Sequence, residues 1–464
     1  MSLEDVPHPK PWFFDSNQTA PLFVGRKNEL KRVMYNLKKN NIESSIIKLA
    51  NIPGIGKTEL VRQFFRTYGW KNEILCIEFD FKHFITLFGS NNSNYQSYKI
   101  CRDYITPQFE WFFNNVQKSE TKLEEYYLFL EEIGDEPNLD FLVFLNRLFN
   151  KPFLNSVPIV FFWDEAQSSY GVGQDLVLTE DNKQIALRWI QKTPSPNHYP
   201  EHSSPFYETV VTYYQGLFRS MCKLIAAFGK PGLRLAIISG TNYSFLQQVD
   251  HLGSPLRGRS VDLRLDPLTG EDVEKWFLSY ISKPAEEHSS RTNWEVLLSK
   301  ISFYSGGIPR FVEYFIGSLI ELEDIYNFSV LDESFKNLFP KLKKILETTL
   351  HPYVEDRLAT LAQDCGLTQT KELFSALGKL SMSKEFFSEL DIEGILSQIQ
   401  WTRKKVTLDD LIEIGLFLRS NGLTSDASSG NLKLVSPYQM DVIRKKYVDG
   451  VWKEEMGCQL VKFI

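Results

Sequence analysis

A glycine-rich segment carries the residues whose types and spacing point most directly to chemistry. It reads Asn51-Ile-Pro-Gly-Ile-Gly-Lys-Thr58 and stands between an apolar run and a stretch with helical periodicity. A loop at such a junction can aim successive backbone N–H groups and the positive end of the helix at a polyphosphate. Gly54 and Gly56 allow the backbone to curl closely, Lys57 can reach the β and γ phosphates, and Thr58 can bring its hydroxyl to Mg²⁺.

The segment departs from the pattern G-x-x-x-x-G-K-[ST] at its first position, where Asn51 replaces glycine. Asparagine is the residue that next best tolerates left-handed backbone, so the match is weakened but not broken. A glycine-rich turn without a ligand is the alternative. The residues predicted to hold the nucleotide here are Pro53, Gly54, Ile55, Gly56, Lys57, Thr58 and Glu59.

A second segment has the acidic residues that such a site needs. The apolar run 159–163 ends in Asp164 and Glu165, and a buried strand needs neither carboxylate for packing. In a phosphate-binding fold the first carboxylate supports Mg²⁺ together with Thr58, and the second polarises the attacking water. We therefore predict Thr58 and Asp164 as metal residues, and Lys57, Asp164 and Glu165 as catalytic residues.

Short apolar runs separated by helical stretches must position these residues. Continuous apolar strands alternating with helices are typical of a parallel sheet covered on both faces, which predicts an α/β domain over 21–268. The expected strands are 46–50, 74–81, 158–163, 233–239 and 261–265. We expect residues 1–20 to form an arm, because they are rich in proline and polar groups without periodicity.

Two insertions interrupt this domain. Residues 82–156 are mostly amphipathic helix with aromatics at helical spacing, which indicates a core stripe rather than a cofactor box. The segment 193–207 contains four prolines with His198 and His202, so a loop is favoured over a helix that could align the two histidines on a metal.

Beyond residue 268 the strand signals stop. Thr269 and Asp272 form a capping-box start for a helix, and 269–329 is predicted as a helical lid. Residues 330–464 are expected to be helical to about Phe417, followed by a hairpin with strands at 423–424 and 432–435, a winged-helix arrangement.

Composition narrows the classes of function. The 464 residues carry a net charge of −6, which argues against a protein that coats nucleic acid. The five cysteines lack the spacing of a metal site, which predicts free thiols. The sequence has no run approaching the ~20 apolar residues of a membrane span and no secretory start, so we expect an intracellular protein, cytoplasmic or nuclear, without a membrane partner.

Five motifs, in this order, resemble those of the AAA+ and STAND classes of P-loop ATPases. They are 23–30, the glycine-rich loop, Asp164-Glu165, 237–242 and 306–310. The resemblance implies ATP and Mg²⁺ as ligands. It also implies that Phe23, Val24 and Gly25 lie near the adenine, and that Thr241 or Asn242 is a polar sensor between the acidic residues and the γ-phosphate.

The same resemblance implies roles for three arginines. Arg257 and Arg259 precede the last expected strand, where AAA+ proteins place an arginine finger that reaches a neighbouring subunit's nucleotide; a solvated turn is the alternative. Arg310 would contact the γ-phosphate from the helical lid. Within the superfamily the motifs look most like the ATPase module of Crinkler and retrotransposon-hot-spot (RHS) proteins, with initiator ATPases of the origin-recognition type as the runner-up.

Three functions remain open from the sequence. The first is an ATPase that couples ATP hydrolysis to domain or subunit arrangement, which is the reading we adopt. The second is a nucleotide-locked scaffold that recruits a protein partner through the helical insertion. The third is a DNA-binding initiator, which the basic clusters 403–405 and 444–446 would support. Residues 330–464 as a whole carry nearly equal numbers of acidic and basic residues. ATP or ADP is a partner in all three, and a homo-oligomer would follow from an arginine finger.

Overall fold

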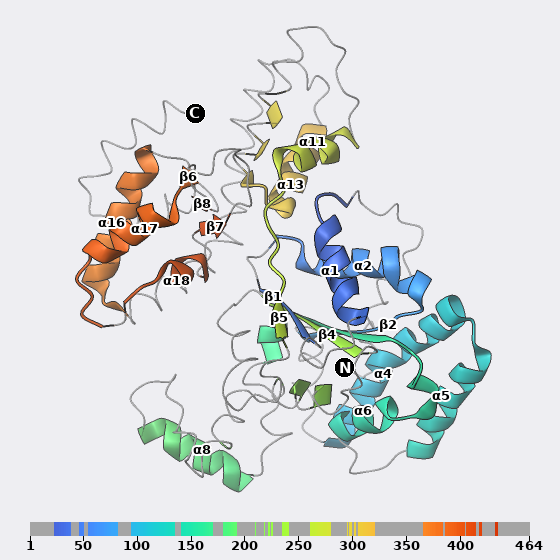
Figure 1. The fold of residues 1–464 in the computed structure, drawn as a ribbon. Coiled ribbons are helices and arrows are strands. Elements are labelled where there is room, and N and C mark those ends of the chain that lie inside the picture. Colours follow the sequence, from blue (N-terminus) through green and yellow to red (C-terminus); the bar gives the residue numbers. More distant parts are fainter. Residues whose placement is uncertain are drawn as a thin grey trace. The chain divides into compact units, whose positions relative to one another are not determined.

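A computed structural model describes the ordered elements of the chain (Figure 1). The described ranges are 23–38, 46–50, 54–81, 94–134, 141–169, 180–192, 234–240, 260–279, 305–320, 365–383, 386–403, 405–413, 417–419 and 432–434, with single helical positions at 209, 218, 221–222, 224–225, 295, 297–298 and 301–302. The chain divides into two compact units. The first comprises 1–21, 26–50 and 57–264, and the second 22–25, 51–56 and 265–464. The boundaries expected from sequence stay predictions.

The first unit is built on a five-stranded parallel sheet, in the order β2-β3-β4-β1-β5. Its strands are β1 (Ile46–Ala50), β2 (Leu75–Asp80), β3 (Ile159–Asp164), β4 (Arg234–Gly240) and β5 (Ser260–Asp262). All five lie within or overlap the apolar runs from which they were predicted, which confirms the α/β fold class. The acidic strand β3 and the loop-bearing strand β1 are not neighbours, because β4 runs between them.

Helices cover both faces of this sheet (Figure 1). On one face lie α1 (Lys27–Lys38) and α2 (Lys57–Phe64), and on the other α4 (Asn94–Phe112), α5 (Glu120–Ile133) and α6 (Phe141–Phe149). Also in this unit are α8 (Glu180–Lys192) and the short turns η4 (Phe65–Gly69), η5 (Trp70–Asn72), η6 (Phe113–Gln117), η7 (Pro152–Leu154) and η8 (Ala166–Ser169).

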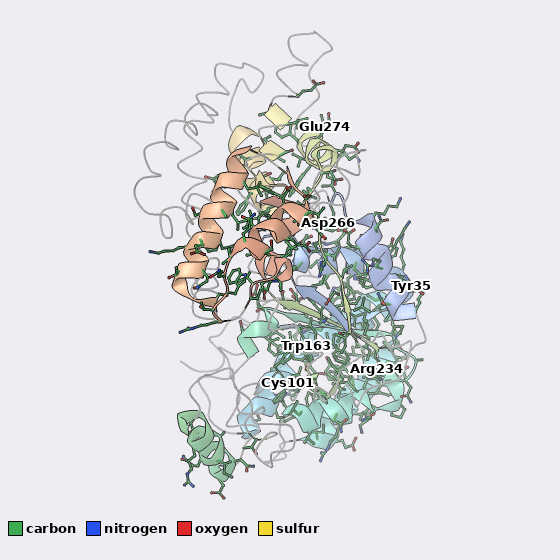
Figure 2. All side chains as sticks on the ribbon, turned by 60° about the vertical axis from the view of Figure 1, so that its left-hand side comes forward. Tyr35, Cys101, Trp163, Arg234, Asp266 and Glu274 are labelled. Carbon is green, nitrogen blue, oxygen red and sulfur yellow. The ribbon has the colours of Figure 1, made fainter. Side chains whose placement is uncertain are left out.

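The helical insertion packs its aromatic side chains into the main core. A single hydrophobic cluster joins α4, α5 and α6 to alternate residues of the strands, such as Phe79, Trp163 and Ile238. Phe109 stacks on Tyr126 with ring centroids 4.6 Å apart. Figure 2 labels Trp163 and Cys101 within this packing. The interpretation of the aromatic spacing as a core stripe is therefore confirmed.

Helix α4 also covers the open edge of the sheet. Strand β2 is an edge strand, and the buried Gln108 side chain accepts the Glu78 N–H (2.8 Å) and donates to the Glu78 carbonyl (3.1 Å). Two residues along, the Asp80 N–H donates to the Tyr104 hydroxyl at 3.1 Å. These side chains supply the hydrogen bonds that a further strand would make, so the edge next to the acidic strand is closed.

At the opposite edge an ion pair between a buried lysine and a partly exposed aspartate joins β5 to β1. Lys48 Nζ lies 3.0 Å from Asp262 Oδ1, and the lysine side chain is only 5% exposed. Because Lys48 and Asp262 are directly paired in the parallel ladder, the ion pair and the backbone register support one another. The Leu263 N–H continues the contact by donating to the Lys48 carbonyl at 2.9 Å.

The second unit contains the helices predicted for the lid. Helix α11 (Gly270–Leu278) begins at Thr269, whose side chain accepts the Asp272 N–H while Asp272 accepts the Thr269 N–H, so the predicted capping box is present. Helix α13 (Pro309–Ile320) follows the Gly306-Gly307 turn. Both glycines have positive φ, and a Cβ on Gly307 would stand 2.4 Å from the Leu268 carbonyl oxygen, which explains the small residue there.

The C-terminal elements have winged-helix connectivity. In chain order they are α16 (Leu367–Ser383), β6 (Phe386–Phe387), α17 (Glu389–Gln398), α18 (Leu408–Glu413), β7 (Phe417–Arg419) and β8 (Leu432–Leu434). The strands form an antiparallel sheet in the order β6-β8-β7. Residues 423–424, expected as a strand, lie outside the described residues.

The first strand of the hairpin begins earlier than predicted. Helix was expected to about Phe417, but α18 ends at Glu413 and Phe417 opens β7. The reason is tertiary, because the buried Phe417 ring packs edge-on against Phe387 of β6, with centroids 5.6 Å apart. The contact joins the two outer strands of this small sheet, on either side of β8.

Two absences complete the description. No helix in the described ranges is long and apolar enough to cross a membrane. Four cysteines, Cys76, Cys101, Cys222 and Cys365, are buried free thiols, as the spacing predicted; Cys458 lies outside the described residues.

Candidate functional site

One group of predicted site residues lies at the carboxyl ends of the strands in the first unit. Helix α2 begins at Lys57, whose side chain is buried, and the next residue, Thr58, donates its hydroxyl to Asp164 Oδ2 at 2.7 Å. These two residues stand 106 positions apart in the chain. The first turn of the loop helix and the end of β3 are thus joined through the groups predicted to support Mg²⁺.

Asp164 is held from a second side. It is buried at the last position of β3, and its Oδ1 accepts the N–H of Glu165 at 3.1 Å. Glu165 leaves the strand with φ of 49°, in the left-handed region, so that the chain turns sharply into η8. A left-handed residue other than glycine is strained, and such strain is typical of functional sites.

Two polar residues that sequence reasoning missed lie beside Asp164. Asp80, the last residue of β2, pairs directly with Asp164 in the ladder. Trp163 pairs with Ile238, so the next residue of β4, Ser239, follows beside Asp164 on its other side. The sequence signal was present, since each is a polar residue at the end of an apolar run, but only the strand order brings the three together.

A buried carboxyl stands one pleat below this row. Burial raises the pKa of Glu78 to about 8; the Arg62 guanidinium of α2 lowers it, while Asp164 and Asp80 raise it. The folded pKa therefore exceeds the value of 4.5 for a free glutamate. The stability associated with Glu78 is consequently complete below about pH 4.5 and is lost as the pH rises towards 8, because over this range the unfolded state releases the proton that the folded state still holds.

Other predicted site residues belong to the second unit, to which the glycine-rich residues 51–56 are assigned. Gly54 and Gly56 have φ of 83° and 95°, values that glycine adopts without strain. The Gly54 carbonyl accepts the backbone N–H of Arg310 at 3.2 Å, and a Cβ on Gly54 would stand 3.0 Å from the Arg310 Cβ. The start of α13 and the glycine-rich residues are therefore in direct contact.

The predicted adenine segment also lies in the lid unit. Gly25 has φ of 71°, and a Cβ there would come within 2.6 Å of Asp272 Oδ2 at the first turn of α11. Phe23 and Val24 are half-buried. The Asp272 side chain therefore takes part in the capping box of α11 and also lies against Gly25 of the predicted adenine segment.

Several predicted site residues lie outside the described residues. These are Asn51, Pro53, Thr241, Asn242, Arg257 and Arg259, together with the loop 193–207 and the basic cluster 444–446. Their roles stay predictions. Ile55 is buried, and Glu59 forms a 2.7 Å ion pair with Arg66, seven residues further along the chain.

The residues that are present fit a magnesium ion. Mg²⁺ keeps several waters and binds through one or two carboxylates plus substrate phosphates, so it needs no all-protein cage. Within the described ranges no three His, Cys, Asp or Glu residues gather into such a cage. The hydroxyl of Thr58, the carboxylate of Asp164 and the unpartnered buried hydroxyl of Ser239 are the hard oxygen donors that this chemistry requires.

Among known proteins, this chain is similar only to solved structures, and that similarity is weak. No protein-family model matches the sequence, and no curated protein matches it either. Solved structures with similar folds include the ORC2 protein of Aeropyrum pernix in ADPNP and ADP complexes, with a TM-score of 0.44 and 11% identity, covering 93% of this chain and 96% of that one. The finer resemblance to the Crinkler and RHS module finds no support in these comparisons.

Two further structures have lower scores. The ORC1 protein of Aeropyrum pernix in complex with DNA has a TM-score of 0.34 and 12% identity, covering 92% of this chain and 94% of that one. Cdc6p from Pyrobaculum aerophilum has a TM-score of 0.34 and 14% identity, covering 92% and 96%. Scores of this size transfer neither ligands nor partners, so the function rests on the residues of this chain.

Proposed function

We propose that this protein binds ATP with Mg²⁺ and hydrolyses it. The observation that carries the proposal is the 2.7 Å hydrogen bond from Thr58 to Asp164, between the first turn of the loop helix and the end of the acidic strand. Packing alone would favour apolar residues at both places. A hydroxyl and a carboxylate held together beside a buried lysine at a helix N-terminus are the groups that a magnesium-bound polyphosphate needs.

Each residue has a distinct role in this proposal. Lys57 offsets the charge of the β and γ phosphates. Thr58 and Asp164 would hold the metal, which would neutralise charge developing on the transferred phosphoryl group. Glu165 orients the attacking water and accepts its proton. The bond from water oxygen to γ-phosphorus forms as the bond to the leaving ADP oxygen breaks, giving ADP and phosphate.

The remaining predicted residues would couple hydrolysis to arrangement of the chain. Thr241 or Asn242 would sense the γ-phosphate, and Arg310 would contact it from α13. Arg257 or Arg259 would act on the nucleotide of a neighbouring copy. These assignments come from the motif resemblance to AAA+ and STAND ATPases and define the finer proposal, an ATPase that switches domain or subunit arrangement.

The decisive experiment measures ATP turnover and nucleotide affinity in parallel. Lys57→Ala should weaken nucleotide binding about 10–100-fold, because a charge-assisted contact worth about 1.5–3 kcal/mol is lost. Glu165→Gln should bind normally and turn over about 10²–10⁴-fold more slowly. Thr58→Val should lose the magnesium dependence that Thr58→Ser keeps, since serine retains the hydroxyl.

Either of two outcomes would contradict the proposal that this protein hydrolyses ATP. A wild-type protein that binds nucleotide tightly without turnover is the nucleotide-locked scaffold. A wild type that binds no nucleotide ends both proposals. If turnover per subunit rises with protein concentration, and Arg257→Ala or Arg259→Ala removes that rise, the finger acts between copies.

DNA binding is a second candidate, because the winged-helix connectivity is shared with many DNA-binding domains. Such domains read DNA with a helix in the major groove, supported by phosphate contacts from lysine and arginine. Helix α18, the helix that precedes the hairpin of the winged-helix elements, has the sequence LDDLIE, with acidic residues and no basic one. Phosphate repulsion opposes its insertion, so we do not propose groove binding. A salt-dependent shift on titration with duplex DNA would reverse that conclusion.

A protein partner is the third candidate. The aromatic stripe of the helical insertion is buried in the core and is not available to a partner. Any contact must use its outer surface, where Leu128 of α5 is 63% exposed. Charge substitution at Leu128 should then reduce partner capture without changing ATP turnover.

A further inference from the structure

Three polar residues end three neighbouring strands on one face of the sheet. Asp80, Asp164 and Ser239 follow one another across β2, β3 and β4, as the pairing of Asp80 with Asp164 and of Trp163 with Ile238 requires. Side chains alternate along a strand, and the opposite face carries the residues that pack on the helical insertion, such as Trp163 and Ile238. The polar row therefore faces α2, the helix that begins with Lys57 and Thr58.

Ser239 is the member of this row whose presence is hardest to explain by packing. It is fully buried, and its hydroxyl has no hydrogen-bond partner among the parts of the chain that the structure describes. A buried hydroxyl without a partner destabilises the folded state, and alanine would fill the same place without that penalty. The neighbouring residues of the same strand, 235–238, are all apolar. Packing alone therefore does not account for a hydroxyl at this position.

The position of Ser239 relates it to the metal residues. The Asp164 carboxylate is already engaged by Thr58 at Oδ2 and by the Glu165 amide at Oδ1. Ser239 lies on the next strand and pairs on its other side with Leu49, two residues before the glycine-rich loop. It stands between the acidic strand and the strand that leads into the phosphate segment.

We propose, resting on the nucleotide site proposed above, that Ser239 is a positioning residue for magnesium. Its hydroxyl hydrogen-bonds a water of the metal's hydration shell and so keeps the ion beside Asp164. Mg²⁺ gives up its waters reluctantly, and outer-shell hydrogen bonds to those waters set the affinity of a site. A hydroxyl suits this place because it can donate or accept, whichever the water requires.

The arrangement also assigns the neighbouring acid. Asp80 flanks Asp164 on the side away from Ser239, and its backbone is fixed by Tyr104 of α4. Waters bound to the metal would therefore meet a row of three oxygen-bearing side chains in which Ser239 is the uncharged end. This row is longer than the Thr58 and Asp164 pair that the sequence predicted.

The test compares Ser239→Ala with Ser239→Thr, which keeps the hydroxyl, and uses binding rather than turnover. Affinity for fluorescent ADP and for a non-hydrolysable ATP analogue is titrated with Mg²⁺ and again in EDTA. Ser239→Ala should lower the apparent Mg²⁺ affinity of the nucleotide complex about tenfold with both nucleotides. It should leave affinity in EDTA unchanged, and Ser239→Thr should restore most of the loss. Without nucleotide, the thermal midpoint of Ser239→Ala should equal or exceed that of wild type.

Each contrary result has a separate meaning. If wild type binds nucleotide with a magnesium dependence that Ser239→Ala shares, the inference is wrong while the proposed function stands. A loss confined to the ATP analogue would make Ser239 a γ-phosphate contact and overturn the metal role. A lower midpoint for nucleotide-free Ser239→Ala would show that the hydroxyl has a partner in the protein itself. Wild type without nucleotide binding overturns the proposed function and this inference together.

Discussion

The left-handed backbone at Glu165 makes a prediction that separates stability from activity. Its φ is 49°, and the same value occurs at Glu73, which caps the η5 turn far along the sequence from the acidic residues. An L-residue in this region costs about 1–2 kcal/mol relative to right-handed backbone, and glycine does not. We expect glycine to be more stabilising than alanine at position 165, the reverse of the ordinary preference.

The magnitude follows from two opposing terms. Replacing alanine with glycine relieves about 1–2 kcal/mol of steric strain, but it raises the entropy of the unfolded chain by about 0.4–1 kcal/mol. The net gain is about 0.5–1 kcal/mol in the free energy of unfolding. At an exposed helical position such as Glu124 of α5, the same exchange should instead cost about 1 kcal/mol, because right-handed backbone suits alanine.

The assay compares alanine and glycine variants at positions 165, 73 and 124 in the nucleotide-free chain, by urea unfolding and scanning calorimetry. Comparing alanine with glycine removes the contribution of the glutamate side chain itself. Glycine should be the more stable variant at 165 and 73, and alanine at 124. ATP turnover should be lost in both variants at 165 and kept at 73 and 124, because of these three glutamates only Glu165 is proposed to serve the reaction.

One result would refute the reasoning. If alanine is more stable than glycine at position 165 by the helical margin, the backbone there is not left-handed, and the interpretation of Glu165 as a strained functional residue is wrong. Stabilisation at 165 with unchanged turnover would keep the strain but remove the catalytic role.

Three further predictions test the surroundings of the site. Glu78→Gln should raise the thermal midpoint at pH 7, because it removes a carboxyl whose folded pKa is about 8. The gain should shrink as the pH falls to 4.5 and vanish below it. A gain independent of pH would contradict the raised pKa of Glu78. Gln108→Leu should cost about 2–4 kcal/mol in urea unfolding, because the N–H and carbonyl of Glu78 both lose their partner, and a neutral result would mean that the edge of β2 is covered by something else. Asp262→Asn should lower the free energy of unfolding by about 2–3 kcal/mol, because the Lys48 charge is left buried without its carboxylate. The loss is smaller than for a fully buried pair because Asp262 is 36% exposed. The Lys48→Met, Asp262→Asn double variant should recover most of it.

Local patterns in the sequence were sufficient wherever the physics is local. The capping box at Thr269 and Asp272 depends on residues three apart, and it is present as predicted. The parallel strands are continuous apolar runs because both faces of the sheet are covered, and each was recognisable for that reason. The glycine-rich segment and the acidic end of β3 were found because their residue types suit phosphate and metal better than packing.

Pairings between distant segments were beyond the reach of such patterns. Periodicity identifies a strand but does not say which strand lies beside it, so the placement of β4 between β1 and β3, and of Ser239 beside Asp164, came from the structure. The start of β7 at Phe417 was missed for the same reason, since its ring packs against a residue of another strand.

What the sequence by itself determined is the chemistry at the ends of two strands, because residue type and near-neighbour spacing decide which groups can hold a phosphate or a magnesium ion. What only the tertiary structure decided is which other groups share that place. Asp80 and Ser239 look like ordinary strand ends in the sequence, and Gln108 looks like one polar residue of an amphipathic helix. Their surroundings consist of hydrogen-bond partners and strand neighbours that lie up to 190 positions away, as from Leu49 to Ser239, and those partners meet only when the chain packs.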